Sequence, residues 1–349
     1  MTFDGLTLAA MAGELQRKLL GARVQKIVQP DAVGIALELY GKRSRAWLVL
    51  SADPQQPRLY LASEKPGRGV ETPSPLLLLL RKHVEGLRLG EIAQPSGERI
   101  VSFGFYGHAP DGSGEPATLR FRLIIEAISQ YSNLILVDAA DQVLDAARRV
   151  TAEQNRTRVT LPHQPYVPPP TQNKRSLADA DVSACLAVLQ DAAPGAAIWQ
   201  ALVAGFAGIG PLAGREIVFR ALGDARARLP NGNLEPIAEQ VGAALHQIVQ
   251  PMFDGSFEAS VAFGEAPVAQ APTDAETATR EAALPVVAFA PYALTHLDRW
   301  EARSSLSLAA EQFYRQARSA TRLDLARREL TVAIDAERKL AERKRESLL

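Results

Sequence analysis

Two glycines lie close together in FAGIGPLAGREI, residues 206–217, just before the start of an apparent helix. Inside a helix, Gly208 and Gly210 would each cost about 1 kcal/mol relative to alanine, so their spacing favours a tight turn. A turn without Cβ atoms lets backbone N–H groups approach a large anion, and the N-terminus of the next helix attracts phosphate. We therefore expect a helix-hairpin-helix whose Gly208, Gly210 and Arg215 contact phosphate. An ordinary turn between two helices is the alternative.

Positive charge gathers at two further places in the chain. Arg81, Lys82 and His83 follow five consecutive leucines. They can bind phosphate, or they can complement the dipole at the C-terminus of a helix. Glu98 and Arg99 follow the turn QPSG and begin a predicted strand. Neighbouring strand residues point to opposite faces, so this pair is either a structural ion pair or a ligand contact in a cleft.

Motifs for catalysis or metal binding are missing from the sequence. There is no HExxH, CxxC, P-loop or GxSxG, and the five histidines have no ligand-like spacing. Cys185 is the single cysteine, which excludes an intramolecular disulfide and a cysteine-based zinc site. The carboxylates are scattered, and none forms a pair with separated pKa values. We expect no catalytic residue, no metal and no cofactor.

Length and charge limit the class of protein. With 349 residues, of which 47% are hydrophobic, the chain can form two or three domains. The 39 basic and 39 acidic residues give a formal charge of zero, so any surface for nucleic acid must be local. No apolar run reaches the roughly 20 residues that cross a bilayer, and no signal peptide is legible. We expect a cytoplasmic protein without membrane contact.

In the first half of the chain, many segments of strand length alternate apolar and polar residues or are apolar throughout, as β-strands do. Residues 5–20 place apolar side chains at helical spacing, and a second helix is expected from about Ser74 to Gly86. Strands are expected at 23–29, 34–40, 46–52, 58–62, 99–107, 117–129 and 132–139. Residues 1–172 are therefore interpreted as a β-rich domain with two packed helices.

The second half is helical and then changes character. The proline-rich residues 161–174 are expected to form an extended linker. Residues 173–250 are expected to form a helical domain that contains the glycine turn, and residues 251–303 a strand and a mobile loop that return to the N-terminal region. From 304 to 349, leucines and alanines fall on heptad positions, which predicts the start of a truncated coiled-coil arm. A terminal helix packed on its own domain is the alternative.

Several blocks of sequence, in order along the chain, resemble the NFACT family. They are MTFDGLTLAAMAGEL, RVQKIVQP, SPLLLLLRKHVEG, GERIVSF, IIEAISQYSNLILVDAADQVLDAARRV, PYVPPP, GIGPLAGREI and SSLSLAAEQFYRQA. The resemblance implies an α+β fold. Its parts would be an N-terminal β-sandwich domain like that of formamidopyrimidine-DNA glycosylases, a helix-hairpin-helix domain and the start of a coiled coil.

The same resemblance implies a role in ribosome-associated quality control without catalysis. Family members bind a large ribosomal subunit that carries a stalled peptidyl-tRNA, recruit a charged tRNA, in bacteria alanyl-tRNA, and support template-free addition of C-terminal alanine. The family's tRNA-recruiting Asp-Arg motif maps onto Glu98 and Arg99, and an N-terminal aspartate maps onto Asp4. Glu98 departs from the family pattern by one methylene. Arg81, Lys82 and His83 are added to this expected tRNA-binding set for their charge.

Three alternative functions follow from the same sequence. An older name of the family implies a surface adhesin that binds fibronectin, although no export signal or adhesive repeat is legible. A DNA-glycosylase-like protein without catalysis is another alternative. Such enzymes use an N-terminal proline and a cysteine zinc finger, whereas this chain begins Met-Thr-Phe-Asp and has one cysteine. A purely structural coiled-coil scaffold is the third.

Overall fold

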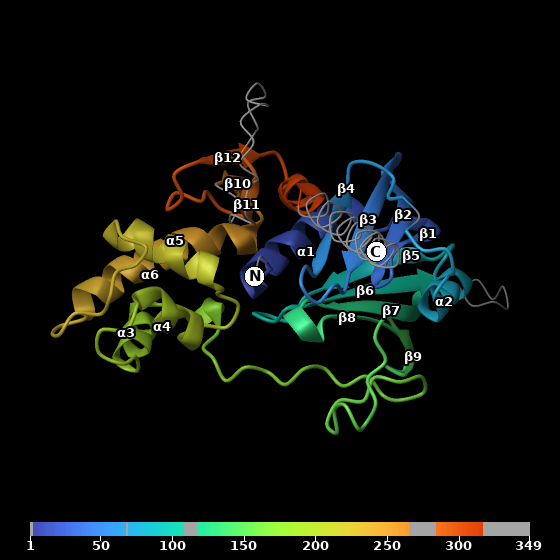
Figure 1. Cartoon of the computed structure of the whole chain (residues 1–349), viewed down its shortest axis with the longest axis horizontal. Helices are drawn as coiled ribbons and strands as arrows, with labels where there is room; N and C mark the ends of the chain where they lie inside the picture. Colours follow the sequence, from blue (N-terminus) through green and yellow to red (C-terminus); the bar gives the residue numbers. More distant parts are fainter. Residues whose placement is uncertain (1–2, 68, 108–116, 265–283, 317–349) are drawn as a thin grey trace, which may run out of the picture.

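The computed structural model describes residues 3–67, 69–107, 117–264 and 284–316. A β-rich part and a helical part lie side by side, with the N-terminus between them (Figure 1). Residues 306–316 are helical, and the rest of the predicted coiled-coil arm lies outside the described residues. The mixture of helices and a large antiparallel sheet confirms the α+β class at this level.

Nine strands form one antiparallel sheet in the order β4-β3-β2-β1-β5-β6-β7-β8-β9. Their bounds are β1 Arg23–Asp31, β2 Gly34–Gly41, β3 Ser44–Ser51, β4 Arg58–Ala62, β5 Arg88–Ala93, β6 Ile100–Gly107, β7 Thr118–Glu126, β8 Asn133–Asp138 and β9 Val143–Ala146. A short 3-10 helix, η1 Ser129–Tyr131, connects β7 and β8. All the strands predicted for this half of the chain are confirmed, with ends displaced by a few residues.

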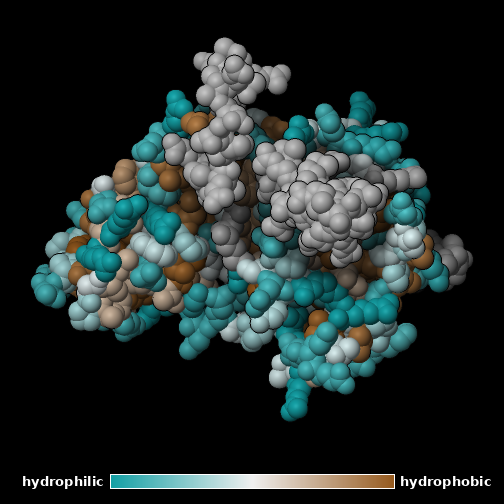
Figure 2. Space-filling view, in the orientation of Figure 1, coloured by the Kyte–Doolittle hydropathy of each residue, from teal (hydrophilic) through white to brown (hydrophobic). Residues whose placement is uncertain are grey.

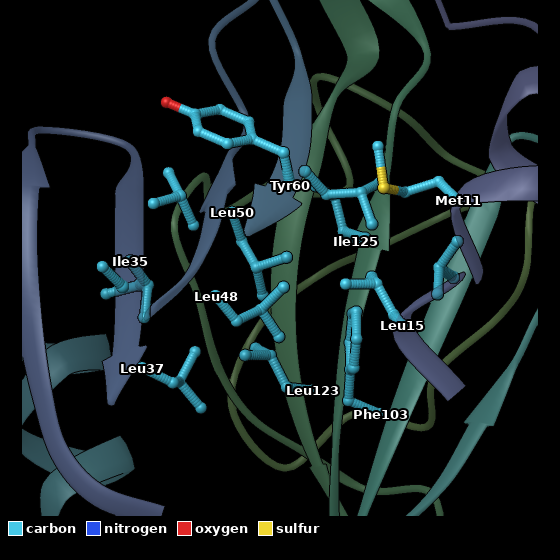
Figure 3. Packing of buried hydrophobic residues seen from close by; sticks show 14 of the residues in the cluster. Met11, Leu15, Ile35, Leu37, Leu48, Leu50, Tyr60, Phe103, Leu123 and Ile125 are labelled. Atoms are coloured by element: carbon cyan, nitrogen blue, oxygen red, sulfur yellow. The ribbon is translucent and has the colours of Figure 1, made fainter. Parts of the chain in front are cut away.

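The sheet folds over on itself and encloses the main core. Strand β3 contacts β8, and side chains from both halves belong to one buried cluster. In Figure 3, one half contributes Ile35, Leu37, Leu48 and Leu50, and the other contributes Phe103, Leu123 and Ile125. The predicted two-layer sandwich is therefore a single continuous sheet, because β1 and β5 pair at Arg23 and Arg88.

Two helices pack on this sheet. The helix α1 (Gly5–Leu19) begins at the N-cap Asp4 and buries an apolar face that contacts β5, β6 and the helical part of the molecule. The helix α2 (Pro75–His83) begins at the N-cap Ser74, with Pro75 in the first turn, and packs on β1 and β9. Both predicted helices are confirmed.

Four helices enclose a second core. They are α3 Val182–Gln190, α4 Ile198–Gly205, α5 Pro211–Leu222 and α6 Glu235–Asp254, preceded by the 3-10 helix η2 Leu177–Asp179. Leu6 of α1 is part of the same buried cluster. The start of the chain therefore belongs to the helical part as well as to the sheet.

A three-stranded sheet lies between the two cores. Its order is β11-β10-β12, with bounds β10 Ala259–Phe263, β11 Val286–Ala290 and β12 Trp300–Arg303. Val261 and Phe289 belong to the first core, whereas Ala262 and Ala288 belong to the second. Each face of this sheet thus packs on one half of the molecule. The strand predicted around residue 260 is confirmed as β10, and nearly all of the predicted loop 266–284 lies outside the described residues.

The surface of the described residues is mixed in character. Figure 2 shows hydrophilic side chains over most of the visible face, with hydrophobic ones scattered among them on the helical part. Most of the large apolar side chains are buried in the two cores. Any binding surface on this face therefore depends on particular polar and charged side chains.

Candidate nucleic-acid interface

Three glycines from distant segments meet where the two halves of the molecule join. Gly5 begins α1, Gly97 lies in the turn before β6, and Gly208 lies in the turn between α4 and α5. A Cβ on Gly5 would lie 2.5 Å from the carbonyl oxygen of Gly97 and 2.7 Å from the Cα of Gly208. Gly97 and Gly208 also have φ values of +73° and +91°, which side chains disfavour. We call Gly5, Gly97 and Gly208 the glycine junction.

The junction gives a physical reason for the glycines of the predicted hairpin. Helices α4 and α5 are joined by residues 206–210, as the sequence indicates for two helices and a tight turn. The close approach at Gly208 is to the chain itself, since its carbonyl oxygen accepts a hydrogen bond of 3.0 Å from the amide of Leu6. A Cβ on Gly210 would lie 2.8 Å from that of Asp4. Phosphate contact by Gly208 and Gly210 stays a prediction.

Asp4 ties α1 to α5. One carboxylate oxygen accepts a hydrogen bond of 2.8 Å from the amide of Thr7, and the other accepts one of 3.0 Å from the amide of Gly210. Burial raises the pKa of Asp4, and the hydrogen bonds from Thr7 and Gly210 oppose that shift. Because both oxygens have partners in the fold, this side chain positions the hairpin turn relative to the N-terminus.

A cavity of about 160 Å³ opens beside the glycine junction. Its charged and polar lining comes from Asp4, Arg99, Lys174 and Gln172, and backbone of the hairpin turn forms another wall. Arg99 approaches from the turn before β6, and Lys174 from the segment that links the two halves of the chain. The structure thus brings the predicted Asp4, Arg99, Gly208 and Gly210 together.

The two cations are close enough to influence each other. Burial lowers the pKa of Arg99, and the carboxylates of Glu98 and Asp4 raise it. Burial also lowers the pKa of Lys174, the charge of Arg99 lowers it further, and Glu98 opposes both effects. Two partly buried cations at one small cavity form a site suited to an anion such as a phosphate.

Glu98 and Arg99 lie in the turn before β6, which begins at Ile100. The amide of Glu98 donates to the carbonyl oxygen of Pro95, and Gln94 donates to the carbonyl oxygens of Gly5 (3.0 Å) and Glu98 (2.7 Å). The prediction that this pair points to opposite faces of a strand is wrong, because the turn around Gly97 continues to Arg99. The turn aims Arg99 at the cavity.

Arg81, Lys82 and His83 lie elsewhere. They form the last turn of α2, at the far end of the β-rich part from the hairpin (Figure 1). Arg81 donates to the carbonyl oxygen of Ile27 at 3.1 Å, and the His83 ring lies 5.0 Å from that of Phe121. Burial, followed by the charge of Lys82, lowers the pKa of His83. These three residues therefore do not share a site with Arg99.

Arg215 lies outside the lining of the cavity. Its side chain is exposed on α5, and its guanidinium carbon lies 4.7 Å from the centre of the Trp199 ring. Stacking on an aromatic face leaves a guanidinium edge open to other groups. Phosphate contact by Arg215 stays a prediction.

Glu216, the next residue on α5, is fully buried, and the sequence reasoning missed it. Its carboxylate accepts hydrogen bonds from Arg220 (2.7 Å), the Thr295 hydroxyl (2.6 Å) and the amide of His296 (3.1 Å), and it contacts the His296 ring at 2.6 Å. Burial raises its pKa, but the bonds from His296, Thr295 and Arg220 prevail and lower it to about 2. Glu216 thus fixes α5 to the segment after β11.

The sequence reasoning also missed Lys174 and Gln172. Both follow a run of prolines that the sequence analysis interprets as a linker. Such a segment has no helical or strand periodicity that would show where its side chains point. The available signal was composition: Asn-Lys-Arg ends the proline-rich stretch beside the domain boundary. Only the path of this segment past the hairpin brings Lys174 to Arg99.

The described residues hold neither a metal-ligand cluster nor a membrane-spanning helix. No group of three or more histidine, cysteine, aspartate or glutamate residues among them is arranged to hold a metal ion. Within the same part of the chain, no helix combines the length and apolar character needed to cross a bilayer.

Curated relatives are similar in sequence to a large part of this chain. A relative named "Rqc2 homolog RqcH" from Bacillus subtilis (strain 168) is 32% identical over 240 residues, which are 68% of this chain and 41% of the relative. A relative of the same name from Streptococcus suis (strain 05ZYH33) is 34% identical over 171 residues, 49% of this chain and 30% of the relative. The chain thus matches less than half the length of these relatives.

Solved structures share the fold. The N-terminal part of the fibronectin/fibrinogen-binding protein from Streptococcus suis superposes with a TM-score of 0.67 at 21% identity, covering 90% of this chain and 100% of that one. The fibrinogen-binding protein from Staphylococcus aureus gives 0.64 at 23% identity, covering 90% and 99%. The MutM (Fpg) protein from Thermus thermophilus gives only 0.32, so the glycosylase-like part of the predicted fold stays a prediction.

The sequence model that describes the NFACT N-terminal and middle domains matches residues 4–348. Because the match extends over almost the whole chain, the protein belongs to the NFACT family.

Proposed function

We propose that this chain is the RNA-binding part of a cytoplasmic ribosome-associated quality-control factor. It would recruit tRNA, alanyl-tRNA in the sense that the family resemblance implies, to a large ribosomal subunit that holds a stalled peptidyl-tRNA. Alanine tailing of the stalled chain would follow from positioning of these partners, without a catalytic residue in this chain. The relatives named RqcH support this role.

The cavity beside the glycine junction is the observation that carries the proposal. Arg99 and Lys174 place two positive charges at a cavity of about 160 Å³, where Asp4 supplies one carboxylate that is already held by amides of the fold. Phosphate contacts supply most of the affinity in protein–nucleic acid complexes and make it sensitive to salt. Arg99 would bind the tRNA backbone, Lys174 would add a second contact, and Asp4 would hold the turn that shapes the cavity.

A titration tests this function. The chain is titrated against labelled tRNA and a DNA duplex of similar size at two salt concentrations, with Arg99→Ala and Lys174→Ala as variants. We expect tRNA to bind preferentially, and each variant to weaken binding about fivefold to tenfold because one charged contact is lost. Arg156→Ala, which removes an exposed arginine far along the chain, is the control. Equal affinity for all variants would contradict the proposal.

A second candidate function comes from the names of the solved structures. Two of them are described as proteins that bind fibronectin or fibrinogen. Immobilised fibronectin and the same titration separate the two functions. Binding to fibronectin that is unchanged by Arg99→Ala, together with no binding to tRNA, would favour an adhesin.

A further inference from the structure

A row of exposed side chains crosses four neighbouring strands at one end of the large sheet. The register pairs Arg88 of β5 with Arg23 of β1, Arg23 with Tyr40 of β2, and Tyr40 with Arg45 of β3. Paired residues on adjacent strands point to the same face, so their side chains form a continuous series. Tyr40 is 47% exposed and the side chain of Arg45 is 75% exposed. We call these four residues the basic row.

Like charges oppose each other within this row. Arg23 and Arg88 are direct cross-strand partners, an arrangement that destabilises a sheet. Arg23 donates from Nε to the carbonyl oxygen of Gly86, and Arg88 donates from Nη1 to that of Gly21, both at 2.9 Å. A guanidinium carries five N–H donors, more than these bonds use. The bonds thus hold both side chains in place while leaving donors for an anion.

The turn next to the row is strained. Gly41 pairs with Ser44, and the two residues between them, Lys42 and Arg43, have φ values of +49° and +61°. A two-residue hairpin with positive φ at both positions favours Asn-Gly, and larger side chains there are uncommon. Both residues are exposed, and the Lys42 ammonium donates to the carbonyl oxygen of Arg17. The backbone therefore adopts an unfavourable conformation that presents two more cations.

The strained Lys42–Arg43 turn and the like charges of Arg23 and Arg88 lie at the same end of these strands. Both features cost stability, which indicates that they were selected for another purpose. The basic row and its neighbouring turn hold five cations, and one carboxylate, Glu38, pairs with Arg45 at 3.5 Å. Positive charge is therefore in excess here, in a chain whose formal charge is zero. We infer that the basic row and the Lys42–Arg43 turn form a second RNA contact, in which the arginines bind phosphates and Tyr40 stacks on an unpaired base. An aromatic ring between cations is the arrangement by which proteins bind single-stranded RNA.

This contact is separate from the cavity at Arg99. The cavity lies at the start of α1, whereas Lys42 bonds to Arg17 in the last turn of the same helix. At about 1.5 Å per residue, the two ends of that helix are roughly 20 Å apart. The inference extends the proposed RNA binding and does not require Arg99, so the two can fail independently.

Binding of a labelled, unstructured single-stranded RNA at about 50 and about 200 mM salt tests the inference. The double variant Arg43→Glu with Arg45→Glu is expected to weaken binding at least tenfold and to lower the salt slope by about 1.4. Tyr40→Ala is expected to weaken binding about fivefold or more, whereas Tyr40→Phe keeps the ring and the affinity. Arg156→Glu, at another exposed arginine, should bind this RNA as the unmodified protein does.

A strain-relieving variant separates binding from folding. Lys42→Asn with Arg43→Gly introduces the preferred turn, so we expect a higher Tm together with RNA binding that is about fivefold weaker. Unchanged RNA affinity in this variant and in the charge-reversal variant would overturn the inference. Equal loss in Arg156→Glu would overturn it too, as would binding to phosphatidylserine vesicles without binding to RNA. If Arg99→Ala loses tRNA binding while the variants of the basic row and its turn bind RNA normally, the proposed function stands and this inference fails.

Discussion

The glycine junction and the basic row differ in how the fold holds positive charge. Arg99 and Lys174 line a small cavity where three backbones are in close contact, and nearby carboxylates influence their pKa values. Arg23, Arg45 and Arg88 instead lie exposed across open strands. At the junction, packing determines where the charges lie, so a change in one affects the other. At the row, charge can be changed with little effect on the core.

The largest change in the free energy of unfolding is expected when a single methyl group is added at the glycine junction. Gly5→Ala should destabilise the protein by about 4 kcal/mol, because its Cβ would meet backbone atoms of Gly97 and Gly208 that cannot rotate away. Gly67→Ala is the control, since a Cβ there has no neighbour within 4 Å. Urea unfolding measures both. Similar unfolding free energies would mean that the junction opens easily.

Removing the charge of Glu216 is expected to have the next largest effect. Glu216→Gln keeps the size of the side chain but weakens its bonds with Arg220 and His296, so we expect a loss of about 3 kcal/mol at pH 7. Glu301→Gln changes an exposed carboxylate that pairs with Arg303 and should cost less than about 1 kcal/mol. Chemical unfolding of both variants checks this, and equal losses would contradict it.

The same residue predicts how stability depends on pH. The folded pKa of Glu216 is about 2, below its ordinary value of 4.5. A lowered pKa means that the stabilisation is complete above pH 4.5 and is lost as the pH falls towards 2. We expect the unfolding free energy to decline over this interval by about 3 kcal/mol more in the unmodified protein than in Glu216→Gln. Parallel pH profiles for the two proteins would count against this role.

Asp4 is expected to show a smaller effect at the same junction. Asp4→Asn can still accept one hydrogen bond, but its amide nitrogen would face the N–H of Thr7 or Gly210, so we expect a loss of about 2 kcal/mol. Asp181→Asn is the control, because Asp181 caps α3 through a single amide, and asparagine serves equally well there. Thermal unfolding distinguishes them. No difference would show that the bond to Gly210 contributes little.

The smallest effect, and the only stabilising one, is expected at the Lys42–Arg43 turn beside the basic row. Lys42→Asn with Arg43→Gly should raise the unfolding free energy by about 1 kcal/mol, because the new residues adopt positive φ without strain. A rise in Tm in differential scanning calorimetry would confirm this. Ala32→Gly, in the turn between β1 and β2 where no positive φ is found, should not stabilise. A fall in Tm for the double variant would show that Lys42 and Arg43 contribute favourable contacts instead.

Local patterns predicted much of the fold. Apolar spacing identified α1 and α2, and the turn residues around Gly208 identified α4 and α5. Strand-like patterns identified most strands of the large sheet, but not the short β9. These signals act over a few residues, so they can be read without knowing distant contacts. The continuous sheet was missed, because the pairing of Arg23 with Arg88 joins segments that are far apart in the sequence.

The site was predicted less completely. Asp4 and Arg99 came from the family resemblance, and the structure places both at one cavity. Lys174 lies in a segment without periodicity, and Glu216 looked like one of many helix carboxylates until its buried partners were seen. Arg81 was grouped with Arg99 because of its charge, but it lies in the last turn of α2 and donates to the carbonyl oxygen of Ile27 on β1. Charge in a sequence does not give its position in space.

The sequence by itself determined the family, most of the helices and strands, and the need for a glycine turn at 206–210. These follow from residue types and spacings that act locally or that match relatives in order along the chain. Only the tertiary structure decided what the glycines approach, which cations share a cavity and which arginines form a row. Such contacts join residues up to 206 positions apart, as Asp4 and Gly210 are, and depend on how the backbone folds between them.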